Sequence, residues 1–190
     1  MRMVLCAMLL LGSVVSCKLR DVQNKPLADL LCRVFDCEQD KTELTPSGYR
    51  TWATTTGETL NYPIPGHEEH FRRIYINSIG EGVSVSQRNG KAYYTYPAGT
   101  IIVKDIFESL EPLPGAEPFQ QTVMIKDPRN PKARGGWLWV VRDEKTAGET
   151  VIDYEFCVDC HSNANESHPY GDTNPNHEFR DFLFFPYQKR

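Results

Sequence analysis

The sequence predicts an α+β fold that is built mainly on an antiparallel β-sheet, with a few short helices. Between residues 71 and 142, runs of aromatic and β-branched residues recur, which is typical of strands. Short segments rich in Gly, Pro and Asn separate these runs. Strands joined by short turns pair antiparallel, because a parallel pair needs a long crossover connection. The predicted strands are residues 71–77, 91–96, 100–107, 121–127 and 136–142, with turns at 97–99, 127–131 and 134–136.

The part of the chain ahead of these strands predicts helix and loop. Residues 26–39 have the apolar spacing of a short amphipathic helix. Residues 40–70 are rich in Thr, Gly and Pro, which is typical of loops, here around a short helix near Tyr49 to Trp52. A chain of 190 residues suits one domain with its own core. We therefore expect a tether with a short helix over 17–44 and one folded domain over 45–190.

The N-terminus has the anatomy of a secretory signal peptide over residues 1–16. Arg2 is followed by an apolar run over 3–11 and then by small residues. The run is too short to span a bilayer, which takes ~20 apolar residues. Val-Val-Ser-Cys at 14–17 also resembles a bacterial lipobox, in which Cys17 would be acylated; ordinary cleavage after Ser16 is the alternative. Both readings export the chain, either to the periplasm or to a lipid anchor on a bacterial membrane.

Two further cysteines, Cys32 and Cys37, lie in the predicted helix. They could pair in an oxidising compartment. Five positions apart on an unbroken helix, however, two cysteines are too distant and lie on different faces. A disulfide between them requires the helix to end near Phe35.

The sequence Cys157-Val158-Asp159-Cys160-His161 is the C-x-x-C-H signature of covalent haem attachment. Two thiols three positions apart can each add to a vinyl group on one porphyrin edge, and the adjacent His161 can then bind the iron. The motif predicts one covalent haem c, held against the sheet in the 45–190 domain. A redox disulfide and a zinc site completed by His168 and His177 are the weaker alternatives.

The sixth coordination position of such a haem separates electron carriers from catalysts and gas binders. Met124 is the one methionine beyond the signal peptide, and its place in a strand is typical of core packing. The remaining histidines lie in polar, loop-like segments, as surface histidines do. We therefore expect an open or water-filled sixth position. The histidines in question are His67, His70, His168 and His177.

Two lysines occupy corresponding places in a short repeated pattern. Lys104 follows Ile-Ile-Val and Lys126 follows Val-Met-Ile, and an aspartate comes after each lysine. On these residues alone, each lysine is typical of a strand end, with its stem packed on apolar neighbours and its ammonium in water.

The composition argues against several classes of function. A formal net charge of −4 lacks the basic stripe that nucleic-acid binding needs. The sequence also has neither a Gly-rich dinucleotide loop nor a nucleophile elbow.

Several segments, taken in order, resemble the cytochrome P-460 proteins and their relatives, the cytochromes c′-beta, over about residues 45–185. They are Tyr49-Arg50-Thr51-Trp52, Gly66-His67, Arg73-Ile74-Tyr75-Ile76-Asn77, residues 96–104, Met124-Ile125-Lys126-Asp127, Gly135-Gly136-Trp137, the haem motif and Asp181-Phe182-Leu183-Phe184-Phe185. The resemblance implies a mostly antiparallel β fold, a homodimer and a five-coordinate haem c with a proximal histidine. In cytochrome P-460 proper a lysine is also bonded to the porphyrin edge. Lys104 is the position to which the resemblance carries that role, with Lys126 as the fallback.

The resemblance leaves three functions open. Cytochrome P-460 oxidises hydroxylamine, which would make this chain a haem oxidoreductase acting on that or a similar small nitrogen compound. The c′-beta relatives bind nitric oxide or other small ligands, with Phe107 or Tyr94 as expected distal caps here. A simple electron carrier would need a sixth protein ligand. Near the stretch expected to supply a distal base stand Lys126, Arg129 and Arg134, with no obvious Glu, and the electron-transfer partner is unknown.

Overall fold

The computed structural model describes residues 43–61, 71–108, 116–165 and 174–189. The chain divides into two units, 1–42 and 43–190, and the described residues all belong to the second. The signal peptide, Cys17, the predicted helix over 26–39 and the Cys32–Cys37 pair therefore lie outside the described residues and stay predictions. Within the described part, the chain has no helix that is long and apolar enough to cross a membrane.

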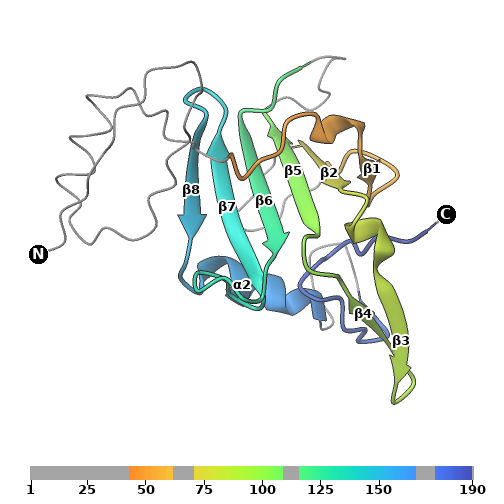
Figure 1. Cartoon of the computed structure of the whole chain (residues 1–190). Coiled ribbons are helices and arrows are strands. Elements are labelled where there is room, and N and C mark those ends of the chain that lie inside the picture. Colours follow the sequence, from red (N-terminus) through yellow and green to blue (C-terminus); the bar gives the residue numbers. More distant parts are fainter. Residues whose placement is uncertain (1–42, 62–70, 109–115, 166–173, 190) are drawn as a thin grey trace, which may run out of the picture. The chain divides into compact units, whose positions relative to one another are not determined.

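A six-stranded antiparallel sheet dominates the second unit, which confirms the α+β prediction (Figure 1). Its strand order is β1-β2-β5-β6-β7-β8. All five predicted strands exist, four of them in this sheet. The strands of the sheet are β1 (Ala53–Thr54), β2 (Phe71–Ile76), β5 (Ile101–Phe107), β6 (Gln120–Lys126), β7 (Trp137–Asp143) and β8 (Gly148–Ile152).

The fifth predicted strand, β4 (Lys91–Thr95), pairs with β3 (Ser84–Arg88) in a separate hairpin that extends away from the main sheet (Figure 1). Short helices complete the unit, and the one α-helix described, α2, carries the C-x-x-C-H motif. These helices are η1 (Tyr49–Thr51), η2 (Gly80–Gly82), α2 (Phe156–Ser162) and η3 (Asn163–Asn165).

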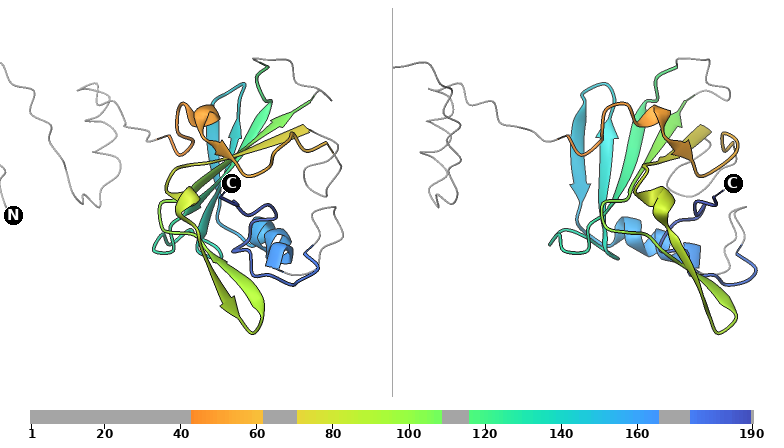
Figure 2. Two further views of the ribbon diagram at one scale, coloured as in Figure 1. Left: turned by 90° about the vertical axis from the view of Figure 1, so that its right-hand side faces the viewer. Right: turned by 45° about the vertical axis from the view of Figure 1, so that its right-hand side comes forward.

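The two faces of the six-stranded sheet bury different side chains, because successive residues of a strand point to opposite sides. On one face Ile102, Met124 and Trp139 pack in one cluster with Val158 of α2. Figure 2 shows α2 beside this face. On the other face, a second cluster of buried residues includes Tyr49 of η1. Val103, Val123 and Val140 belong to that second cluster.

The register of the strands sets one row of side chains on the α2 face. Ile74 of β2 is opposite Lys104 of β5, Lys104 is opposite Thr122 of β6, and Thr122 is opposite Val141 of β7. Lys104 is therefore a mid-strand residue flanked by neighbouring strands on both sides. Asp105, the next residue along the chain, points to the η1 face.

Asp105 is fully buried on the η1 face. It accepts hydrogen bonds from the Tyr49 hydroxyl and from Arg50 Nε, the latter at 3.2 Å. Burial raises the pKa of this carboxyl, while the bonds to Tyr49 and Arg50 oppose the rise. These contacts tie η1 to the middle of β5.

Candidate functional site

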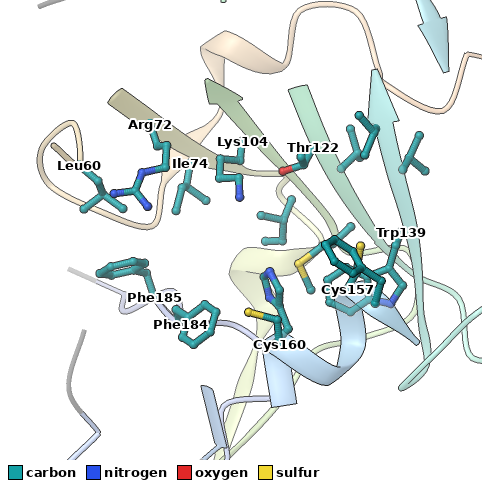
Figure 3. Close-up of a pocket in the computed structure, with 17 residues that line it drawn as sticks. Leu60, Arg72, Ile74, Lys104, Thr122, Trp139, Cys157, Cys160, Phe184 and Phe185 are labelled. Atoms are coloured by element: carbon teal, nitrogen blue, oxygen red, sulfur yellow. The ribbon is translucent and has the colours of Figure 1, made fainter. Parts of the chain in front are cut away.

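A cavity of about 340 Å³ lies between the sheet and α2 (Figure 3). Side chains reach it from β2, β5, β6 and β7 on one side, and from α2 and the C-terminal segment on the other. The lining is predominantly apolar, as ligand pockets usually are. Its apolar members include Leu60, Ile74, Ile102, Phe156, Phe184 and Phe185.

Cys157 and Cys160 reach the cavity from α2. Residues three positions apart lie on one face of a helix, so the helical conformation directs both thiols to the same side. Both cysteines are half-buried, and they do not form a disulfide with each other. Burial raises the pKa of each thiol, and the positive charge of Lys104 opposes this effect.

His161 also lines the cavity, and its Nδ1 lies 2.8 Å from the backbone carbonyl oxygen of Phe182. A carbonyl only accepts hydrogen bonds, so Nδ1 carries the proton and Nε2 carries the lone pair that a metal needs. The ring packs against Trp139 and Phe184, with centroid distances of 4.8 and 5.0 Å. Its orientation is therefore fixed by one hydrogen bond and two aromatic contacts.

Lys104 enters the same cavity from the sheet (Figure 3). Its surroundings are chiefly Ile74, Ile102 and the Thr122 side chain. Burial, together with the positive charge of Arg72, lowers the pKa of Lys104 to about 7. At neutral pH a large fraction of this amine is therefore unprotonated, and an unprotonated amine is a nucleophile.

Lys126, the fallback for the same role, is held elsewhere. Its side chain points to the same face of the sheet, but at the end of β6. Its Nζ lies 2.7 Å from Oδ1 of Asp181 and 4.8 Å from the centre of the Trp137 ring. Lys126 is not among the described residues that line the cavity. Of the two lysines, the structure brings Lys104 together with the haem motif.

Arg72 is a cavity residue that the sequence reasoning missed. It is 1% exposed and lines the cavity from β2. The signal was available, since Arg72, Ile74 and Ile76 alternate along one strand and must share a face. With Lys104 and Thr122, Arg72 supplies polar groups to an otherwise apolar space.

The prediction that Phe107 or Tyr94 caps the distal side of the haem was wrong. Phe107 and Tyr94 are buried, but neither lines the cavity in the described part of the chain. Leu60 and Phe185 line the cavity, as does Phe184, which packs against the His161 ring.

The other side chains that could bind iron differ in whether they line the cavity. Met124 lines the cavity but is also packed in the core of the α2 face. His177 is exposed, while His67, His70 and His168 lie outside the described residues. No lining residue that the structure describes is Asp or Glu, and Arg129 and Arg134 do not line the cavity either. His161 is the one described histidine that reaches it.

The donor set fits a covalent haem. Two thiols and one imidazole on a single short helix face an apolar cavity. The imidazole proton is committed to a backbone carbonyl, as is usual for histidines that ligate metals. The alternative zinc site stays untested, because His168 lies outside the described residues.

A mainly antiparallel β protein whose cavity is faced by a C-x-x-C-H helix belongs to the class of haem-binding β proteins. The family model for cytochrome P460 matches residues 46–184, which is most of the chain. The chain belongs to the cytochrome P460 family and is a haem protein of that family. No curated protein matched the chain.

Proposed function

We propose that this chain is an exported haem oxidoreductase that acts on hydroxylamine or a similar small nitrogen compound. The observation that carries the proposal is the position of Lys104. Its amine shares one apolar cavity with Cys157, Cys160 and His161, and its pKa is lowered to about 7. A lysine in that place and protonation state supports a bond to the porphyrin edge, the feature expected of the hydroxylamine-oxidising members.

The residues of α2 would hold the cofactor. Cys157 and Cys160 would add their thiols to the two vinyl groups, and His161 would ligate the iron through Nε2. The haem, when bound, would supply the redox chemistry. The signal-like N-terminus supports export, since c-type haem attachment and an acylated Cys17 both belong outside the bacterial cytoplasm.

Lys104 would form the additional bond to the cofactor. Joining its Nζ to a porphyrin carbon removes one hydrogen from each atom, which amounts to two protons and two electrons. The step therefore needs a two-electron oxidant, such as a peroxide. Only the unprotonated amine has the lone pair for this bond, and burial beside Arg72 favours that form.

The remaining polar groups would then face the substrate. Once Lys104 is bonded, Arg72 and Thr122 are the polar side chains of the described lining. Their donors suit a small ligand with nitrogen and oxygen lone pairs, such as hydroxylamine. The apolar walls exclude water and strengthen such hydrogen bonds.

Capture of nitric oxide, as in the c′-beta proteins, is the alternative that a specific observation favours. Phe184, Phe185 and Leu60 give the cavity an apolar wall, and its described lining offers no carboxylate that could accept protons from a substrate. A simple electron carrier is less well supported, because Met124, the potential sixth ligand, is packed in the core. A homodimer and an unidentified redox partner remain expectations from the resemblance.

The test is made on the mature protein, produced together with a c-haem maturation system. Digestion followed by mass spectrometry should give a haem peptide that retains the segment containing Lys104. Hydroxylamine should reduce an added oxidised dye in the presence of this protein. An unmodified Lys104 peptide, with nitric oxide binding and no dye reduction, would favour the gas-binding alternative. A protein without covalent haem would overturn both.

A further inference from the structure

The turn at residues 180–183 has a backbone conformation that is rare for its side chains. The Leu183 N–H donates to the Arg180 carbonyl at 3.1 Å, which closes the turn. The two central residues, Asp181 and Phe182, have φ angles of 50° and 70°. Aspartate visits this left-handed region readily, but a bulky residue such as Phe does so rarely. Such a turn persists only where its surroundings hold it in place.

Asp181 provides the first hold. Asp181 is 4% exposed, and its carboxylate accepts hydrogen bonds from Lys126 Nζ at 2.7 and 2.8 Å. It also accepts from Trp137 Nε1 and from the backbone N–H of Tyr96, both at 3.3 Å. The donors come from β6, β7 and the segment after β4, so Asp181 fixes the turn to three separate parts of the domain.

Asn165 provides the second hold. Its side-chain oxygen accepts from the backbone N–H of Arg180 at 2.8 Å and from that of Phe182 at 3.3 Å. Asn165 ends η3, which follows α2 directly. The turn is therefore fixed both to the sheet and to the haem-attachment helix.

The turn presents the Phe182 carbonyl oxygen to His161 Nδ1, 2.8 Å away. The Phe182 ring packs over Gly135, where an added Cβ would come within 2.8 Å of the ring. The contacts of Asp181, Asn165 and the Phe182 ring thus all help to position the Phe182 carbonyl, which in turn orients the His161 imidazole.

We propose that Lys126 and Asp181 are a positioning pair for the iron ligand His161. They hold the turn so that the Phe182 carbonyl accepts the Nδ1 proton, which makes the imidazole a stronger donor to the iron. The inference rests on the proposed haem ligation by His161, but not on any substrate. A stronger donor stabilises ferric iron and lowers the reduction potential.

The experiment measures two properties of the haem-loaded protein: its ferric/ferrous midpoint potential and the iron–histidine stretching frequency of the ferrous form. Asp181→Ala removes all four bonds to the carboxylate. Asp181→Asn removes the same charge, but keeps an acceptor oxygen and a side chain that tolerates the left-handed backbone. Lys126→Met removes the opposite charge. Glu117→Gln is the control, because it breaks an ion pair with Arg50 on the η1 side, where Glu117 is exposed.

A positioning role predicts that Asp181→Ala lowers the stretching frequency and raises the potential, and that Asp181→Asn does so less. Lys126→Met should also raise the potential, although losing a positive charge alone would lower it. Glu117→Gln should shift neither property. Should Asp181→Ala fail to fold, Lys126→Met still decides the matter.

Two results would overturn the inference. One is a lower potential in Lys126→Met with an unchanged stretching frequency, which would mean that the pair acts through charge alone. The other is unchanged values of both properties in the Asp181 and Lys126 variants. A wild-type protein with covalent haem but no iron–histidine band would instead overturn the assignment of His161 as ligand.

Discussion

The two Lys-Asp steps of the chain, at residues 104–105 and 126–127, have similar sequences but opposite surroundings. Lys104 lies in the middle of β5 and faces an apolar cavity beside Arg72. Lys126 ends β6 and is bound by the buried carboxylate of Asp181. The aspartates differ as well, since Asp105 is fully buried and Asp127 is partly exposed at a turn.

The difference shows that a lysine's chemistry is set by what lies across the fold from it. Lys126 has the Asp181 carboxylate within 2.8 Å and is held there in an ion pair. Lys104 has apolar neighbours and a second cation near it, which favour its neutral form. The lowered pKa of Lys104 therefore makes its amine available as a nucleophile at neutral pH.

The largest expected effect is the loss of the lysine–porphyrin bond, which should follow substitution of Lys104 but not of Lys126. In Lys104→Met, the haem should remain attached through Cys157 and Cys160, but the additional bond to β5 should disappear completely. In Lys126→Met that bond should persist. Digestion and mass spectrometry of the haem peptides measures both outcomes. A cross-link that survives in Lys104→Met would break the comparison.

The next effect concerns pH. The lowered pKa of Lys104 means that the neutral amine predominates above pH 7 and the ammonium below it. At pH 6 about a tenth of the amine is neutral, so cross-link formation should be about tenfold slower than at its plateau. The rate is followed after adding a two-electron oxidant to uncrosslinked protein between pH 5.5 and 8.5. A rate that still rises steeply at pH 8.5 would show an ordinary lysine instead.

A third effect tests the packing around the turn that Lys126 helps to hold. Gly135→Ala should lower the free energy of unfolding by about 2–5 kcal/mol, because overpacking costs ~1–3 and a left-handed residue ~1–2 kcal/mol. Gly135 has a φ of 62°, and an added Cβ would lie 2.8 Å from the Phe182 ring. Urea unfolding measures the change.

Gly90→Ala is the matched control for this substitution. Gly90 also has a positive φ, of 75°, but nothing lies within 4 Å of an added Cβ. It should therefore show the backbone cost of ~1–2 kcal/mol alone. Equal effects at the two glycines would mean that the Phe182 ring moves aside without cost.

The smallest effect concerns the aspartate of the first pair. Tyr49→Phe removes the hydroxyl that Asp105 accepts from, and should lower the free energy of unfolding by about 1–3 kcal/mol. Urea unfolding again measures it. Glu117→Gln, which breaks an exposed ion pair, should cost less than ~1 kcal/mol. A Tyr49→Phe variant as stable as the wild type would show that Arg50 alone suffices for Asp105.

Much of the fold was predictable, because buried strands carry a strong apolar signal. The run at 100–107 is rich in β-branched apolar residues, and β5 is found there. β3 was missed because all five of its residues are exposed and its sequence lacks apolar alternation. β1 has only two residues, too few to show any period.

The site was predictable only where its chemistry is local. Cys157, Cys160 and His161 are read from five consecutive residues. What distinguishes Lys126 from Lys104 is its contact with Asp181. Asp181 lies 55 positions beyond Lys126 in the sequence, and only the fold brings the two together. Long-range pairing of this kind has no signature in a single sequence.

The buried Asp105 has a consequence for how this site can change. Side chains alternate along β5, so a shift of one residue would send Asp105 into the cavity and Lys104 to the η1 face. The contacts of Asp105 with Tyr49 and Arg50 oppose that shift. The hydrogen bonds of Asp105 on the η1 face thus fix the register of β5, and with it the side chains that β5 presents to the cavity. Insertions or deletions within β5 are therefore tolerable only in pairs, and an amine can move along the cavity only in two-residue steps.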